Sequence, residues 1–176
     1  MKTNNKFLFV LILFLFSGCY ANIKSRKAPD FNSEITKFYA VLKLGDNIGR
    51  FGPRFSRSLQ ELMLLRGVEL EYEILDPLAL ETEQEVLNRI RKSNADGVMF
   101  ITQTASSVTY SSNSISLMKR NATGGTFDVK VFVPGRENPV WRGVLKTGTN
   151  GNGDLTVVAK RSARRLCNQL AQDRLI

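Results

Sequence analysis

The sequence predicts a single mixed α/β domain, with one five-stranded sheet packed against three helices. Five segments have the apolar patterns of strands, either alternating or continuous, and in three others apolar residues recur at helical spacing. These segments follow the order β-α-β-α-β-β-β-α, with helices between the first three strands. Because helical crossovers join parallel strands and short turns join antiparallel ones, this order predicts a mixed sheet.

The first half of the domain alternates strands with helices. Residues 35–44 are apolar on both faces, which is typical of a strand inside a sheet. After Pro53, apolar residues recur at helical spacing until Gly67, which predicts a helix that ends there. In residues 68–74, apolar side chains alternate with three glutamates, so we expect an edge strand with one solvent-exposed face.

A short second helix and a buried strand follow. Thr82 and Glu85 have the spacing of a capping box at a helix start. The expected buried stripe of this helix is Val86, Leu87 and Ile90. The continuous apolar run 98–101 predicts a third strand inside the sheet.

The second half of the domain predicts a hairpin and a long final helix. Residues 127–133 and 140–146 are the hairpin strands, with Trp141 as a core or edge anchor. The polar stretch 102–125 before them predicts extended strand ends around a long, mobile hairpin loop. Asp154 is the expected N-cap of the last helix, whose apolar pattern contains Cys167. We expect the strand at 68–74 at one edge, then 35–44, 98–101 and the hairpin strands.

The first 18 residues have the pattern of a cleaved secretion signal. Lys2 and Lys6 precede an apolar run, Phe7 to Phe16, which is followed by Ser17, Gly18 and Cys19. The run is ten residues long, whereas a helix that spans a bilayer needs roughly 18 or more. We therefore expect the leader to be removed.

The end of this leader resembles the lipobox of bacterial lipoproteins, which is Leu, then Ala or Ser, then Gly or Ala, then Cys. Ser17, Gly18 and Cys19 match it, and Phe16 replaces the leucine. The resemblance implies a diacylglycerol on the Cys19 sulfur and cleavage before that residue. The alternative is an ordinary signal peptide that ends near a cysteine. In enterobacterial lipoproteins, an Asp directly after the cysteine is the usual signal for retention in the inner membrane. This chain has Tyr20 there, which favours the outer membrane, with the domain facing the periplasm.

Three segments result: a signal peptide at 1–18, a lipidated flexible tether at 19–34, and one periplasmic domain at 35–176. The element order of the last segment resembles small periplasmic αβ lipoprotein domains. Among these are the amino-terminal domain of the Tol-system propeller protein, the curli secretion lipoprotein and the lipoprotein activators of peptidoglycan synthases. The resemblance rests on element order, so it implies a fold and transfers no functional residue.

Composition limits the chemistry available to the chain. The formal net charge is +9, and there is no histidine, the commonest general base and metal ligand. In an envelope, a basic protein meets anionic head groups or acidic partners, so we expect no nucleic acid. We also expect no small-molecule substrate, no metal and no cofactor beyond the lipid on Cys19. Cys167 is expected to be a buried structural thiol.

Two basic clusters are the candidate partner-binding residues. The first contains Arg50, Arg54 and Arg57, at the start of a helix, where positive charge opposes the helix dipole. The second lies on the polar side of the final helix and consists of Lys160, Arg161, Arg164 and Arg165. Each cluster is either a solvated face or a docking surface for acidic protein or anionic head groups.

Other motifs have simpler explanations. Gly148, Gly151 and Gly153 precede a helix but lack the Gly-Lys-Ser/Thr ending of a P-loop, so a flexible turn is the better interpretation. Asn150, Asn152 and Asp154 provide one carboxylate, too few for a calcium loop. The serines between residues 106 and 114 have no histidine to activate them.

The sequence therefore favours a non-enzymatic, outer-membrane-anchored lipoprotein that binds a protein or envelope partner. The alternative is an oligomeric component of an envelope secretion or transport assembly. A hydrolase is a third and weaker hypothesis.

Overall fold

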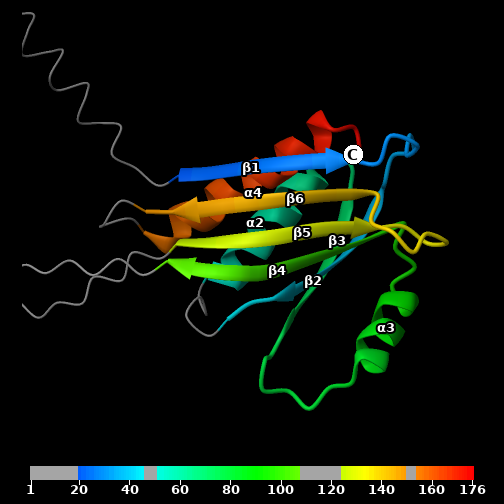
Figure 1. The fold of residues 1–176 in the computed structure, drawn as a ribbon, viewed down its shortest axis with the longest axis horizontal. Coiled ribbons are helices and arrows are strands. Elements are labelled where there is room, and N and C mark those ends of the chain that lie inside the picture. The colour runs from blue at the N-terminus through cyan, green and yellow to red at the C-terminus, as the bar shows by residue number, and fades with distance from the viewer. Residues whose placement is uncertain (1–19, 46–50, 108–123, 150–153) are drawn as a thin grey trace, which may run out of the picture.

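The computed structural model describes residues 20–45, 51–107, 124–149 and 154–176, which form a six-stranded mixed sheet with three helices (Figure 1). The elements are β1 (Tyr20–Lys27), β2 (Lys37–Lys43), α2 (Phe51–Leu64), β3 (Glu69–Leu75), α3 (Glu83–Lys92), β4 (Gly97–Ser107), β5 (Gly124–Phe132), β6 (Trp141–Gly148) and α4 (Leu155–Gln172). The strand order is β1-β6-β5-β4-β2-β3.

Five of these strands lie in the predicted order. β2 is parallel to both β3 and β4, because helical crossovers connect them. β5 is antiparallel to β4 and to β6, as expected for the hairpin strands. β3, with its alternating glutamates, lies at one edge of the sheet. The mixed α/β class and the predicted order of these five strands are confirmed.

The prediction of five strands is wrong, because the sheet has a sixth strand within the segment expected to be a tether. β1 pairs antiparallel with β6 along its whole length, from Tyr20 opposite Gly148 to Lys27 opposite Trp141. Its inward side includes the buried Ile23 and the polar Ser25, whose hydroxyl donates to Asp173 at 2.6 Å. Polar inward positions hide the alternation that apolar residues would reveal. The tether expected at 19–34 is therefore a strand over its first described residues.

One face of the sheet, which we call the helix face, packs against α2 and α4 (Figure 1). The core between them is fully buried, and Trp141 at its edge is 1% exposed. The largest side chains of this core are Phe38, Met99, Phe127 and Leu145 from the strands and Phe55, Leu59, Met63, Leu166 and Leu170 from the helices. Burial of this apolar surface is the main favourable contribution to folding.

The predicted helix ends are confirmed. Thr82 and Glu85 form a reciprocal capping box at the start of α3. Asp154 caps α4 by accepting a hydrogen bond from the backbone N–H of Thr156 at 2.8 Å. Gly67, with φ of 76°, follows the last turn of α2 in a conformation that glycine adopts without strain. Within the described ranges, no helix has the length and apolar character needed to cross a membrane.

The expected buried stripe of α3 is wrong. Val86 and Ile90 are only partly buried and Leu87 is 42% exposed, because α3 lies against the opposite face of the sheet, beside β2 and β3. We call this opposite side the outer face. α3 covers only one end of it, so its apolar residues meet a short stretch of sheet and not a second helix layer (Figure 1).

Candidate functional site

The structure places the predicted basic residues on the helix layer, apart from Arg50, which lies outside the described residues, as does the predicted lipidation site Cys19. Arg54 and Arg57 are exposed on α2. The exposed residues of α4 include Lys160, Arg161, Arg164 and Arg165. The guanidinium of Arg54 is 3.8 Å from the carboxylate of Asp154, so Arg54 forms an ion pair with the N-cap residue of α4.

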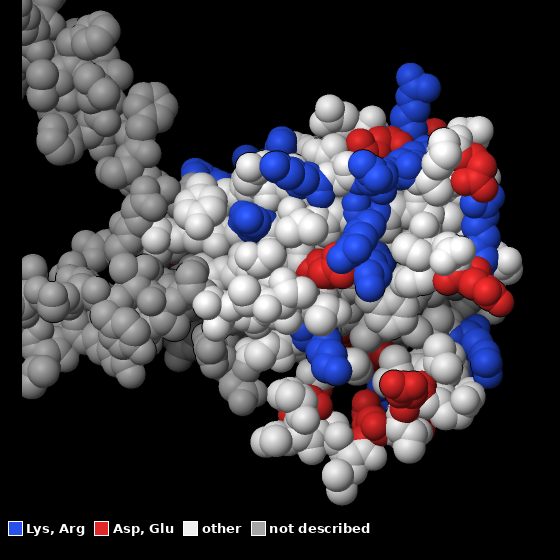
Figure 2. All heavy atoms as spheres, in the orientation of Figure 1, with Lys and Arg blue, Asp and Glu red and all other residues white. Residues whose placement is uncertain are grey.

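A denser group of cations lies on the outer face, on three neighbouring strands. We call it the basic face, and it consists of Lys24 and Arg26 on β1, Lys130 on β5, and Arg142 and Lys146 on β6. Figure 2 shows Lys and Arg side chains gathered over β1, β6 and β5, where no helix covers the sheet. The prediction of partner-binding residues did not include this surface.

The strand register brings three of these cations into one row. Arg142 lies opposite Arg26 on one side and opposite Lys130 on the other. Like charges directly opposite each other in a sheet destabilise the pairing. Asp128 partly compensates, since Arg142 donates to it at 2.8 Å and Lys130 approaches it at 3.6 Å. Folding alone does not favour this row of like charges, and an anionic ligand would reduce the repulsion between them.

Two hollows adjoin the basic face. The larger, of about 600 Å³, has four cations in its wall. We call it the basic hollow, and its lining is Lys24, Ser25, Arg26, Lys27, Ala28, Pro29, Pro139, Arg142 and Val144. A second hollow of about 270 Å³ shares Lys24 and Val144 with it and is also lined by Asn22 and Lys146. The two hollows form one basic surface along β1 and β6.

A hydrogen-bond cluster fixes β1 and β6 behind this surface. The carboxylate of Asp173, just after α4, accepts from Trp141 Nε1 at 2.6 Å and from the Ser25 hydroxyl at 2.6 Å. Lys27 Nζ donates to the carbonyl oxygen of Arg174 at 2.8 Å. These contacts hold the edge strand that carries Lys24 and Arg26 in a defined position.

The opposite end of the outer face is acidic. Arg89 of α3 donates to Glu73 on β3 at 2.6 Å and to Glu81 at 2.9 Å. These two carboxylates raise the pKa of Arg89 further above its usual value, so it stays charged. Lys37 pairs with Glu71 at 2.8 Å, which raises the pKa of Lys37. Charge is thus segregated on this face, with cations over β1 and β6 and carboxylates around β3 and α3.

An apolar pocket of about 300 Å³ lies between α3 and the sheet. Val86, Leu87 and Ile90 of the helix face Val41 and Phe100 across it, with Lys43 and Glu83 among the other lining residues. These α3 residues, expected in the core, therefore form the wall of a surface pocket.

The candidates for catalysis and metal binding gain no support. No group of potential metal-ligating side chains occurs in the described parts of the chain. The loop glycines Gly151 and Gly153, the asparagines Asn150 and Asn152, and the serines beyond residue 107 lie outside the described residues. Cys167 is buried as predicted, and its burial raises the pKa of the thiol. Its sulfur accepts a hydrogen bond from Arg66 at 3.1 Å.

The basic face does not form a cluster in the sequence, because its cations are close together only in space. The signal is present as alternation: Lys24 and Arg26 are two residues apart, and Arg142 and Lys146 occupy the same face of their strand. Only the register of β1, β6 and β5 shows that they meet.

Comparison with known proteins finds similarity in structure only. No family model matches the chain. No curated protein matches its sequence. The PelC dodecamer from Paraburkholderia phytofirmans matches with a TM-score of 0.54 and 12% identity, over 84% of this chain and 96% of that chain. A point variant of the same dodecamer gives a TM-score of 0.56 at 10% identity with the same coverage, 84% and 96%. Such low identity shows a shared fold alone.

Proposed function

We propose that this chain is a lipid-anchored, non-enzymatic component of a bacterial envelope assembly, and that its basic face binds an acidic or anionic partner. The observation that carries the binding role is the row of Arg26, Arg142 and Lys130 on an uncovered sheet face. This arrangement costs stability in the isolated domain. Electrostatic complementarity with a partner would offset that cost and orient the encounter.

The anchor follows from the leader and its lipobox-like end. β1 begins at Tyr20, directly after Cys19. Consecutive Cα atoms are about 3.8 Å apart, so an acyl group on Cys19 would hold the edge of the sheet at the membrane without a tether. We propose the outer membrane as the site and the periplasm as the compartment, as the residue after the cysteine favours.

A second candidate role is that of an oligomeric assembly component. The specific observation in its favour is the fold that the chain shares with the PelC dodecamer over 96% of the PelC chain. The two roles are compatible if the partner of the basic face is another subunit.

Crosslinking in intact cells tests the binding role. The full chain is compared with a Lys24→Glu, Arg26→Glu variant, and copurifying proteins are identified after crosslinking at low and high salt. We expect a salt-sensitive partner that the variant loses. The matched control is Arg161→Glu, Arg164→Glu on α4, which should keep that partner. If both variants retain every partner, the basic face is not the binding surface.

Fatty-acid labelling tests the anchor independently. We expect the wild type to incorporate labelled lipid and to sediment with membranes, whereas Cys19→Ala incorporates none. Equal labelling of both proteins would contradict lipidation at this residue.

A further inference from the structure

We propose that copies of this chain associate head to tail, with the acidic leucine loop of one copy docked in the basic hollow of the next. The acidic leucine loop is residues 75–85, between β3 and the first turn of α3. This inference rests on the proposed assembly role and names a second copy as the acidic partner of the basic face.

The loop has the composition of a docking segment. Residues 75–85 contain Asp76, Glu81, Glu83 and Glu85 and no lysine or arginine. Leu80 is 99% exposed and Leu78 is 84% exposed, a costly arrangement for large apolar side chains in an isolated domain. Neighbouring exposed leucines flanked by carboxylates match a partner that offers apolar contacts surrounded by cations.

The local structure holds the loop in a defined shape. The side chain of Asp76 accepts a hydrogen bond from the backbone N–H of Leu78 at 2.9 Å, and the Asp76 carbonyl accepts one from Ala79 at 3.0 Å. Arg89 ties Glu81 to the sheet through Glu73. Both leucines are therefore presented on an ordered turn, which lowers the entropic cost of docking.

The basic hollow provides the complementary surface. Four cations and no carboxylate line it, together with apolar side chains of Ala28, Pro29, Pro139 and Val144. Lys24 and Arg26 have no hydrogen bond or ion pair with any residue in the described ranges, so their charges are available to a partner. The hollow, of about 600 Å³, is large enough for leucine side chains.

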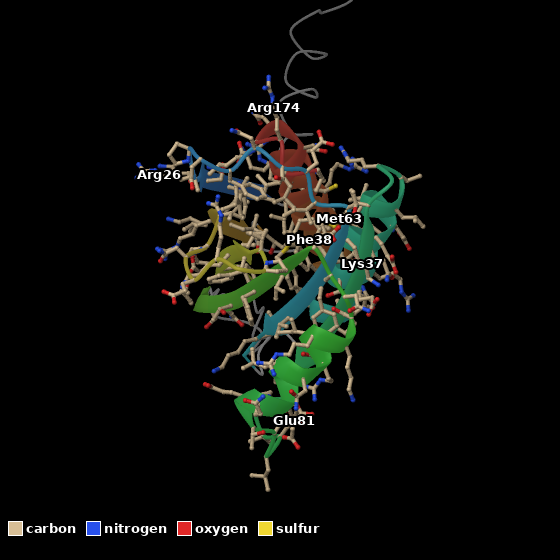
Figure 3. All side chains as sticks on the ribbon, turned by 90° about the vertical axis from the view of Figure 1, so that its right-hand side faces the viewer. Arg26, Lys37, Phe38, Met63, Glu81 and Arg174 are labelled. Carbon is tan, nitrogen blue, oxygen red and sulfur yellow. The ribbon has the colours of Figure 1, made fainter. Side chains whose placement is uncertain are left out.

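The two surfaces lie at opposite ends of the molecule. β1, which lines the hollow, is one edge of the sheet, and β3, which leads into the loop, is the other. Figure 3 shows Arg26 at the upper left and Glu81 at the lower tip. The loop therefore cannot fill the hollow of its own copy. Contacts between two different surfaces are heterologous, so they propagate from copy to copy and build a ring or an open filament.

A charge-swap experiment on the full chain in mild detergent tests this arrangement by light scattering at low salt. Variant H carries Lys24→Glu, Arg26→Glu and Arg142→Glu, which leaves three carboxylates and one cation, Lys27, in the hollow. Variant L carries Glu81→Lys, Glu83→Lys and Gln84→Lys, which leaves three cations and two carboxylates, Asp76 and Glu85, in the loop. It loses the Arg89 contact with Glu81 and keeps the contact with Glu73. Each variant alone opposes like charges, so we expect each to be monomeric under conditions where the wild type is multimeric, with association weakened roughly tenfold or more.

Mixing the two variants gives the decisive result. In the mixture, the basic loop of L faces the acidic hollow of H, and the acidic loop of H faces the basic hollow of L. We expect multimers to reappear, with the two variants alternating, and to dissociate at high salt. A misfolded variant could not restore assembly, so this outcome separates binding from folding. The control variant Glu61→Lys, which reverses an exposed charge on α2 outside both surfaces, should associate like the wild type.

Three outcomes would overturn the proposal: a wild type that is monomeric over the accessible concentration range, variants that assemble like the wild type, or a mixture that stays monomeric. Any of these leaves the proposed function separately testable, because a salt-sensitive partner lost in variant H in cells would then be a different acidic molecule. If neither multimers in detergent nor a salt-sensitive partner in cells is observed, both proposals are wrong.

Discussion

The two faces of the sheet use the same strands for different purposes. On the helix face, Phe127 and Val129 of β5 are buried at 1% and 0% exposure against α2 and α4. On the outer face, the alternate residues Asp128 and Lys130 of the same strand take part in a charged row. The helix face stabilises the fold, whereas the outer face gives up stability to display charge. We infer that recognition is confined to the outer face, which contributes less to the core than the helix face does.

The largest expected effect compares two phenylalanines on β5. Phe127 is buried on the helix face, and its ring stacks on that of Phe51 with the ring centroids 5.2 Å apart. Phe132 is half-buried on the outer face. Phe127→Ala should lower the free energy of unfolding by about 3–5 kcal/mol, because it leaves a cavity in the core. Phe132→Ala should cost about 1 kcal/mol, through its edge contact with Phe100. Denaturant titration measures both, and equal losses would contradict the division between the faces.

The attachment of β1 should show the next largest effect. Asp173→Ala removes the acceptor for Trp141 and Ser25, which leaves the indole N–H unpaired in the core. We expect a loss of about 1–3 kcal/mol in the free energy of unfolding. Asp173→Asn, which keeps one acceptor oxygen, is the control and should lose less. If the alanine variant matches the wild type, this cluster does not fasten the edge strand.

The attachment of α3 should matter locally and not globally. Arg89→Met removes the contacts with Glu73 and Glu81 while it keeps most of the aliphatic side chain. Because α3 has no buried residue, we expect faster hydrogen exchange in its amides and little change in the unfolding midpoint. Arg91→Met, on the same helix, is the control. Slower or unchanged exchange in α3 would show that apolar contacts alone hold it.

The smallest effect concerns pH. The Thr36 hydroxyl donates to Asp96 at 2.6 Å and lowers the pKa of that carboxyl below its usual value. A lowered pKa contributes stability above the unfolded pKa, and this contribution disappears as the pH falls through the folded pKa. Thr36→Val should raise the pKa of Asp96 in an NMR titration and flatten this part of the acid transition, whereas the control Thr36→Ser, which keeps the hydroxyl, should not. An unchanged pKa in the valine variant would assign the shift to the backbone N–H donors instead.

The helix face was the part of the fold that could be predicted from the sequence. Apolar periodicity reports burial directly, so the order of five strands and the caps at Thr82 and Asp154 followed from local patterns. β1 was missed because Ser25 and Lys27 point inward and find polar partners that are far away in the chain. The amphipathic pattern of α3 predicts a buried stripe, but so short a pattern does not indicate how much of the sheet is available to cover the helix.

The candidate site was harder to predict, because it depends on register. Lys130 and Arg142 flank a turn, but Arg26 joins their row only through the pairing of β1 with β6. The predicted clusters on α2 and α4 are close in sequence, and the structure places them on the helix layer, away from the charged row. Their role in binding stays a prediction.

Site-specific photo-crosslinking in intact cells tests most directly the claim that recognition is confined to the outer face. A photoreactive residue is placed either at Lys146, on the basic face, or at Lys160, on exposed α4. We predict a discrete crosslinked product from position 146 that disappears when Lys24 and Arg26 are replaced by glutamate, and none from position 160. A product from position 160 alone, or one from position 146 that persists in that variant, would contradict it.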